Sequence, residues 1–181
     1  HEEIYSHFPD RSPENISVLD VGTGPGFFAI LLAESGFHVT AVDMTPEMLD
    51  EARQNAGLLA EKIDFREMNA EDLCLRDGSY DVVVSRNLTW NLPHPDKAYS
   101  EWRRVLRPDG LLLNFDSNWY SYLFDKTARK KYEEDRISSA DLGLGDQNVG
   151  ENFDVMENIA LSMPLSGVSS PAWDREVLAW L

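Results

Sequence analysis

The sequence predicts an α/β fold, a doubly wound three-layer sandwich around a mostly parallel sheet. The first observation is the run from Ile16 to Gly26, in which a buried strand enters a glycine-rich turn. The second is that an apolar helical stretch follows the turn, and that the next strand ends in Asp43, about twenty residues after the glycines. This is the layout of a nucleotide-binding unit, and it places Asp43 where a carboxylate accepts hydrogen bonds from ribose hydroxyls.

The helices of this unit are predicted from their ends. A short helix is expected around residues 2–8 and another over 24–35, which ends at Gly36 because glycine accepts the left-handed conformation of a C-terminal cap. Thr45 as cap and Pro46 as first helical residue begin a helix that continues to about residue 60. A helix over 98–106 ends before Pro108, whose ring cannot continue it.

The strands are predicted from short apolar runs over 16–21, 39–43, 63–67, 80–85 and 110–116. Leu111, Leu112 and Leu113 form a continuous run of the kind that is buried on both faces of a parallel sheet. After Asp116 the alternation of strands and helices ends. A charged helix is expected over 121–137, and a long polar passage over 138–170 contains one helix near 155–163.

Length and composition indicate one domain spanning residues 1–181. With 43% apolar and 27% charged residues, the chain can bury one substantial core, and its longest apolar run, 27–33, cannot cross a bilayer. The lone Cys74 excludes an internal disulfide, suits a reducing cytoplasm and is expected to be partly buried. The four histidines and Cys74 show no metal-ligand spacing, so no metal site is predicted.

The net charge of −16 argues against nucleic acid as a partner, because phosphates would be repelled. The densest basic cluster contains Lys126, Arg129, Lys130 and Lys131, and the acids Glu133, Glu134 and Asp135 follow it at helical spacing. A solvated helix face with internal ion pairs is therefore the favoured interpretation of this cluster.

The glycine spacing separates two kinds of cofactor. A dinucleotide fingerprint reads G-x-G-x-x-G, whereas this chain has Gly22-x-Gly24-x-Gly26, with Asp20 two residues before the first glycine. In these residues the sequence resembles the class I S-adenosylmethionine (SAM) dependent methyltransferases, a Rossmann-like family, here of the small-molecule type. The resemblance implies that Gly22, Thr23, Gly24 and Gly26 carry the methionine half of SAM, and that Asp20 holds its ammonium group directly or through a water.

The resemblance extends over residues 16–116 and implies further cofactor contacts. Asp43 and the adjacent Met44 would lie at the ribose, and Asn69, Ala70 and Glu71 follow strand 63–67 where the family has an acidic turn around adenine. Asn69 replaces the commoner aspartate, and its amide oxygen can still accept a hydrogen bond from the adenine amino group. Ser85, Arg86 and Asn87 would lie near the methionyl and sulfonium part.

The resemblance also implies where the methyl acceptor binds, because insertions after the fifth strand commonly cover it in this family. Residues 117–170 form the expected insertion, and residues 171–181 begin the last helix. Trp119, Tyr120 and Tyr122 either line the acceptor pocket or pack the inserted helix on the core. His94, between two prolines, is either a general base or a loop histidine without catalytic duty.

The predicted activity is in-line transfer of the SAM methyl group to a small molecule, which yields S-adenosylhomocysteine (SAH) and needs alignment more than a catalytic triad. The Asn-Pro-Pro-aromatic tetrad of base and glutamine methylators is absent, since the chain reads Ser85-Arg86-Asn87-Leu88 there. Two alternatives are a SAM-binding module without methyl transfer and, less favoured, an NAD-dependent oxidoreductase. A monomer or homodimer is expected, with five strands of the family's seven-stranded sheet because the sequence given stops at Leu181.

Overall fold

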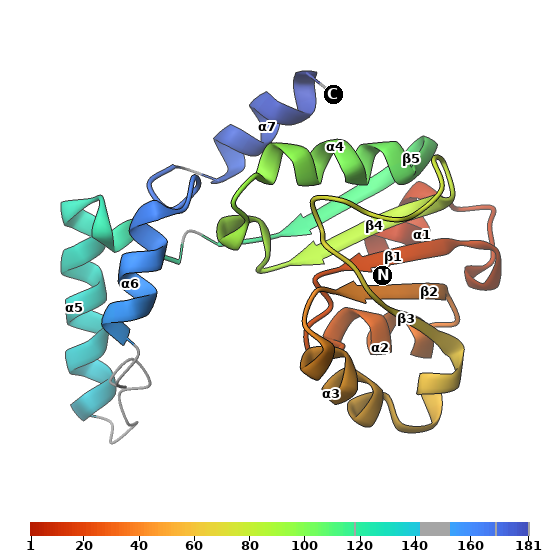
Figure 1. Cartoon of the computed structure of the whole chain (residues 1–181), viewed down its shortest axis with the longest axis horizontal. Helices are drawn as coiled ribbons and strands as arrows, with labels where there is room; N and C mark the ends of the chain where they lie inside the picture. Colours follow the sequence, from red (N-terminus) through yellow and green to blue (C-terminus); the bar gives the residue numbers. More distant parts are fainter. Residues whose placement is uncertain (118, 142–152, 169, 181) are drawn as a thin grey trace. The chain divides into compact units, whose positions relative to one another are not determined.

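The computed structural model describes residues 1–117, 119–141, 153–168 and 170–180, and the chain divides into two units (Figure 1). The first unit consists of residues 1–88 and 94–116, and the second consists of residues 89–93 and 117–180. The first unit contains the whole sheet, and the described residues of the second unit form helices and no strand. The two units are therefore treated separately.

A five-stranded sheet in the order β3-β2-β1-β4-β5 forms the centre of the first unit. Its strands are β1 (Ser17–Val21), β2 (His38–Asp43), β3 (Ile63–Glu67), β4 (Tyr80–Arg86) and β5 (Leu106–Phe115). All neighbouring strands pair in parallel, as the arrows in Figure 1 show, so their carboxyl ends share one edge. The strand order reverses between β1 and β4, the position where open α/β sheets bind ligands.

Helices cover both faces of this sheet. Helices α1 (Glu2–His7), α2 (Phe27–Glu34) and α3 (Pro46–Ala56) contribute to one buried cluster with Val18, Val39, Val82 and Val84, against which Leu111 and Leu113 also pack. Side chains alternate along a strand, so Asn114 faces the other side. There its amide nitrogen donates to the hydroxyl of Tyr99, a buried residue of α4 (Pro95–Val105). The doubly wound, three-layer α/β architecture is thus confirmed.

Several helix boundaries differ from the sequence prediction. Helix α2 starts at Phe27 rather than Gly24, because Gly24 and Gly26 have positive φ values of 53° and 92° that a right-handed helix cannot contain. Helix α3 ends at Ala56 and continues as the 3-10 helix η2 (Gly57–Lys62), where Gly57 has a φ of 54°. Helix α4 starts three residues early, with Pro95 in its first turn.

Two predictions about individual side chains are wrong. Leu111, Leu112 and Leu113 are only half-buried, because β5 is the outermost strand of the described sheet and has one neighbour. Cys74 is exposed rather than partly buried, since it lies in the irregular segment between β3 and β4. The predicted start of α3 is confirmed, with Thr45 as N-cap and Pro46 in the first turn; the Thr45 side chain makes no cap hydrogen bond, and its backbone N–H donates to Asp43 Oδ1 at 2.9 Å.

The predicted turn at Pro108 to Gly110 lies inside β5 as an irregularity rather than before it. The partner of β4 changes from Leu106, opposite Tyr80, to Leu111, opposite Val82, and Asp109 has a φ of 64°. Strand β5 therefore begins at Leu106, four residues before the predicted start.

A buried carboxylate joins three segments at the amino ends of the strands. Asp81, 2% exposed, accepts two hydrogen bonds from the Arg11 guanidinium at 2.7 and 3.0 Å and one from the Ser17 backbone N–H at 2.9 Å. Arg107 forms a second ion pair with it at 2.6 Å. Burial alone would raise the pKa of Asp81, but the hydrogen bonds from Arg11, Ser17 and Arg107 outweigh it and lower the pKa to about 2.

The second unit contains the 3-10 helices η3 (Thr89–Asn91) and η4 (Ser121–Leu123) and the helices α5 (Lys126–Asp141), α6 (Phe153–Ser162) and α7 (Ser170–Trp180). Helix α5 starts at Lys126, five residues later than predicted, because residues 121–123 form η4. Arg129 and Lys130 pair with Glu133 and Glu134 along α5, which confirms the solvated helix face predicted for this basic cluster. No helix in the described part of the chain is long and apolar enough to cross a membrane.

Candidate functional site

The turn after β1 presents backbone at the carboxyl edge of the sheet. Gly22, Gly24 and Gly26 all have positive φ, and the N–H groups of Gly22 and Thr23 donate to the carbonyl of Val42 at 2.9 and 3.0 Å. These bonds tie the turn to the end of β2. A Cβ built on Gly24 would have no atom within 4 Å, so open space lies above this residue, where a ligand can approach the main chain.

Gly22 is packed tightly by a residue that the sequence analysis did not identify. A Cβ at Gly22 would lie 2.7 and 2.9 Å from the two methyl carbons of Leu88. Leu88 follows β4 and lies next to Asn87, but nothing in the local sequence indicates that it reaches the turn after β1. The side chain of Leu88 therefore belongs to the wall of this turn.

Asp20 is a buried carboxylate whose described partners include no cation. It is 2% exposed, and its Oδ2 accepts a hydrogen bond of 2.7 Å from the Thr23 hydroxyl. Burial raises the pKa of Asp20 to about 6; the hydrogen bonds from Thr23 and the Ala29 backbone oppose this rise, and the nearby charge of Asp43 adds to it. No lysine or arginine among the described residues lies within ion-pair distance of Asp20.

Asp43 ends β2 and holds the turn from the other side. Its Oδ2 accepts from the Gly24 N–H and its Oδ1 from the Thr45 N–H, both at 2.9 Å. Each carboxylate oxygen has a further lone pair, so both can still accept from a ligand hydroxyl. The next residue, Met44, is exposed.

The segment predicted to surround adenine follows β3. Asn69 Oδ1 accepts from the Glu71 N–H at 3.0 Å, and the Ala70 carbonyl accepts from the Trp102 indole of α4 at 3.1 Å. Glu71 Oε1 accepts from the backbone N–H of His94 at 2.7 Å. These bonds fix the segment against α4, from its last turn at Trp102 to its start, where His94 is the exposed N-cap residue.

Ser85, Arg86 and Asn87 lie at the end of β4, opposite the ends of β1 and β5. Ser85 is fully buried, and its hydroxyl has no hydrogen-bond partner in the described part of the molecule. Asn87 has a φ of 53°, and its N–H donates to the carbonyl of Phe115 at 2.9 Å. Arg86 is exposed, with its guanidinium carbon 4.6 Å from the centre of the Phe27 ring.

The predicted acceptor residues Trp119, Tyr120 and Tyr122 lie in the second unit. Trp119 is exposed, whereas Tyr120 packs on Trp90 with ring centres 5.3 Å apart, and Tyr122 stacks on Tyr132 at 4.0 Å. Tyr122 donates a hydrogen bond of 3.0 Å to Glu157. Burial, and then the Glu157 carboxylate, raises the pKa of Tyr122. The sequence analysis missed Trp90 and Glu157 because their contacts join segments far apart in the chain, and it also missed Tyr132, the stacking partner of Tyr122 in α5.

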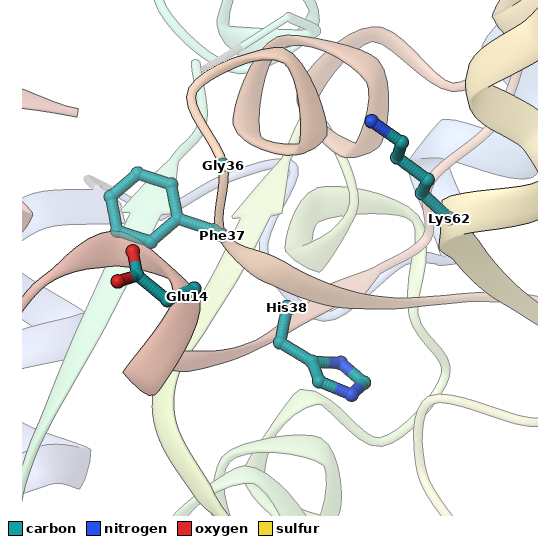
Figure 2. Close-up of a pocket in the computed structure, with 5 residues that line it drawn as sticks. All are labelled: Glu14, Gly36, Phe37, His38 and Lys62. Atoms are coloured by element: carbon teal, nitrogen blue, oxygen red, sulfur yellow. The ribbon is translucent and has the colours of Figure 1, made fainter.

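A shallow hollow of about 220 Å³ lies at the opposite edge of the sheet. Figure 2 shows its lining residues, Glu14, Gly36, Phe37, His38 and Lys62, around the amino ends of β2 and β3. It contains none of the predicted site residues. Among the described residues, no group of three or more His, Cys, Asp or Glu side chains could hold a metal ion.

The fold and the glycine turn place the chain in the class of doubly wound α/β proteins that bind a nucleotide cofactor at the carboxyl ends of their strands. Residues 19–114, more than half of the chain, match the family model described as a methyltransferase domain. The chain therefore belongs to this family, that of the class I SAM-dependent methyltransferases, and the cofactor of the family is SAM.

Named relatives agree with this membership. The chain is 39% identical over 112 residues to a malonyl-[acyl-carrier protein] O-methyltransferase of Geobacter sulfurreducens, a match covering 61% of this chain and 42% of that protein. It is 34% identical over 101 residues to a ubiquinone biosynthesis O-methyltransferase of Actinobacillus pleuropneumoniae, a match covering 53% of this chain and 43% of that protein. The crystal structure of a SAM-dependent methyltransferase from Aquifex aeolicus aligns with a TM-score of 0.50 at 27% identity. The alignment covers 59% of this chain and 58% of that structure. The chain thus spans less than half the length of these two curated relatives.

Proposed function

We propose that this chain binds SAM at the carboxyl edge of its sheet and serves the transfer of the SAM methyl group to a small-molecule acceptor. The observation that carries the proposal is Asp20, a buried carboxylate that no described cation of the chain neutralises. A carboxylate in such a place is costly unless a positive group reaches it. The ammonium group of the methionine half of SAM is such a group.

Other features of this edge fit the same cofactor. The open space above Gly24 suits a ligand that lies against the main chain. The buried Ser85 hydroxyl has an unused donor and acceptor. Asp43 retains acceptor capacity for both ribose hydroxyls, and residues 69–71 are held in place for adenine by their bonds to α4.

Each part of the chain then has a defined task. Gly22, Thr23, Gly24 and Gly26 support the methionine half, Asp20 binds its ammonium, and Asp43 with Met44 borders the ribose. The main chain of Ser85, Arg86 and Asn87 borders the sulfonium. The bound cofactor supplies an activated methyl group, so the chain has to align the acceptor and exclude water. His94 is the candidate base if the acceptor must lose a proton, because it is exposed at the start of α4 beside the Glu71 segment.

The acceptor is proposed to be a small molecule, and Trp119, Tyr120 and Tyr122 of the second unit are proposed to contribute to its recognition. A chain charge of −16 disfavours nucleic acid. The malonyl and ubiquinone relatives are named for different acceptors although they share the same core with this chain. The exposed free thiol of Cys74 supports a cytoplasmic location.

The test is calorimetric titration of the chain with SAM, SAH and NAD in parallel. We expect SAM and SAH to bind and NAD not to bind. Asp43→Ala should weaken SAH binding by about 1.5–3 kcal/mol, the range for hydrogen bonds to a charged group. Asp43→Asn, which keeps one acceptor oxygen, should weaken it less.

Glu67→Gln is the matched control for the Asp43 variants. Glu67 is also an acid at a strand end, paired in register with Asp43, but it is exposed and, in the described part of the molecule, no hydrogen bond joins it to the glycine turn. Its removal should leave SAH binding unchanged. NAD binding, or an Asp43→Ala variant that folds and binds SAH as tightly as the wild type, would contradict the proposed function.

A further inference from the structure

Arg86 is an exposed cation at the carboxyl edge of the sheet, where β2 and β3 end in the acids Asp43 and Glu67. Arg11, Arg104 and Arg107 each bind a carboxylate in the first unit. No carboxylate among the described residues lies within ion-pair distance of Arg86, and its guanidinium packs on the ring of Phe27. In a chain with twice as many acidic as basic residues, 32 against 16, this leaves an unusual positive charge available to a ligand.

The contact with Phe27 positions the guanidinium without consuming its hydrogen-bond donors. The guanidinium carbon lies 4.6 Å from the ring centre, within the range of a cation–π interaction. This interaction involves the face of the ring and no acceptor oxygen. The planar fork of N–H groups therefore remains free for a carboxylate, which it can bind through two parallel hydrogen bonds.

Aromatic surface lies beside this cation. Phe27 is 55% exposed and Phe115, at the end of β5, is 48% exposed. Phe28 connects them, with ring centres 5.4 Å from Phe27 and 5.3 Å from Phe115. Large exposed aromatic side chains grouped around one charge are typical of a binding surface. The group suits a ligand that has an apolar body and a negative end.

This group adjoins the residues proposed to bind SAM. Phe27 directly follows Gly26, the last glycine of the turn, and Arg86 lies between Ser85 and Asn87 at the end of β4. A molecule bound to the side chains of Phe27 and Arg86 would therefore lie beside the cofactor, where an acceptor has to be.

We propose that Arg86, Phe27 and Phe115 bind the methyl acceptor, and that this acceptor carries a carboxylate on an apolar body. The inference rests on the proposed function, because it takes the edge next to these residues as the SAM site. Arg86 is a specificity-determining residue here, and its side chain binds the acceptor while its main chain borders the cofactor.

The experiment compares an acid with its neutral analogue on the SAH-saturated chain. The probes are 4-phenylbutanoate and 4-phenylbutanamide, whose affinities are measured by ligand-observed NMR titration. We expect the wild type to bind the acid about tenfold more tightly than the amide, as for a charge-assisted bidentate pair. Arg86→Gln should remove this preference. Phe27→Ala should weaken both probes, and the acid by the larger factor, because Phe27 also positions the Arg86 guanidinium.

Matched variants separate this effect from general changes of charge and surface. Arg103→Gln removes an exposed arginine in the last turn of α4, away from the carboxyl ends of the strands. This variant should keep the preference for the acid over the amide. Leu58→Ala removes an exposed apolar side chain of η2 and should change neither affinity. Arg86→Lys keeps the charge but lacks the planar fork, so it should lower the preference without abolishing it. If Arg86→Gln does not fold, the test rests on Arg86→Lys, and an unchanged preference for the acid in that variant would contradict the inference.

SAH binding by the wild type, measured first, tests the proposed function. A chain that does not bind SAH would overturn the proposed function and this inference with it. A chain that binds SAH but binds acid and amide equally would overturn the inference alone. Arg86 variants that bind SAH and retain the full preference for the acid would also overturn the inference alone.

Discussion

Gly22→Ala tests whether the turn after β1 is shaped by Leu88 as well as by backbone conformation. The φ of Gly22 is +68°, a region that costs an alanine about 1–2 kcal/mol. The new Cβ would also lie 2.7 and 2.9 Å from the Leu88 methyl carbons, so Leu88 must move. Overpacking costs about 1–3 kcal/mol, and the flexible end of a leucine favours the lower part of that range. We expect a total loss of about 2–3 kcal/mol in the free energy of unfolding.

The assay is urea unfolding at neutral pH, with Gly78→Ala as the matched control. Gly78 has a φ of +57° and no atom within 4 Å of its built Cβ, so that variant reports the backbone cost alone. The double variant Gly22→Ala/Leu88→Ala, compared with Leu88→Ala, should recover the packing part of the loss. The reasoning is refuted if Gly22→Ala destabilises the chain no more than Gly78→Ala, or if truncating Leu88 relieves nothing.

Two further predictions concern buried acids. Asp81→Asn should lower the free energy of unfolding at pH 7 by about 2 kcal/mol, the equivalent of lowering a pKa from 3.8 to about 2. Because folding lowers this pKa, the stabilisation is present above about pH 4 and is lost as the pH falls towards 2; urea unfolding at several pH values should show this loss in the wild type and not in the variant. For Asp20, with a pKa raised to about 6, SAH affinity should rise from pH 5 to pH 7 as the carboxylate ionises, and calorimetry of Asp20→Asn should show weaker, pH-independent binding.

Much of the first unit could be predicted from local sequence. The bounds of β3 agree with the prediction, and β1, β2 and β4 agree to within one residue, because parallel strands are short apolar runs between polar turns. The starts of two helices were less predictable, because they depend on whether a glycine or proline lies before the helix or in its first turn. The glycine turn delays the start of α2 to Phe27, and Pro95 starts α4 early.

The contacts that shape the candidate site were less accessible to sequence reasoning. The acids Asp20 and Asp43 could be singled out from their spacing to the glycines. Leu88 could not, because its contact with Gly22 joins the segment after β4 to the turn after β1, which are far apart in the sequence. Likewise, Asp81 lies in the apolar run of β4, and its partner Arg11 is 70 residues away in sequence. Long-range pairs of this kind leave no local pattern.

Asp20 and Asp81 show how the same chemical group indicates different roles at the two edges of one sheet. Both carboxylates are 2% exposed. The chain itself provides two guanidinium groups for Asp81, so the charged form is favoured and its pKa falls to about 2. For Asp20 it provides a hydroxyl and a backbone N–H, which do not offset burial, and the pKa rises to about 6. Keeping Asp20 ionised at pH 7 therefore costs the folded chain about 3 kcal/mol, a cost that a cationic ligand would remove on binding. Asp81 is thus explained by the fold alone, whereas the buried charge of Asp20 agrees with the proposed binding of a positively charged ligand.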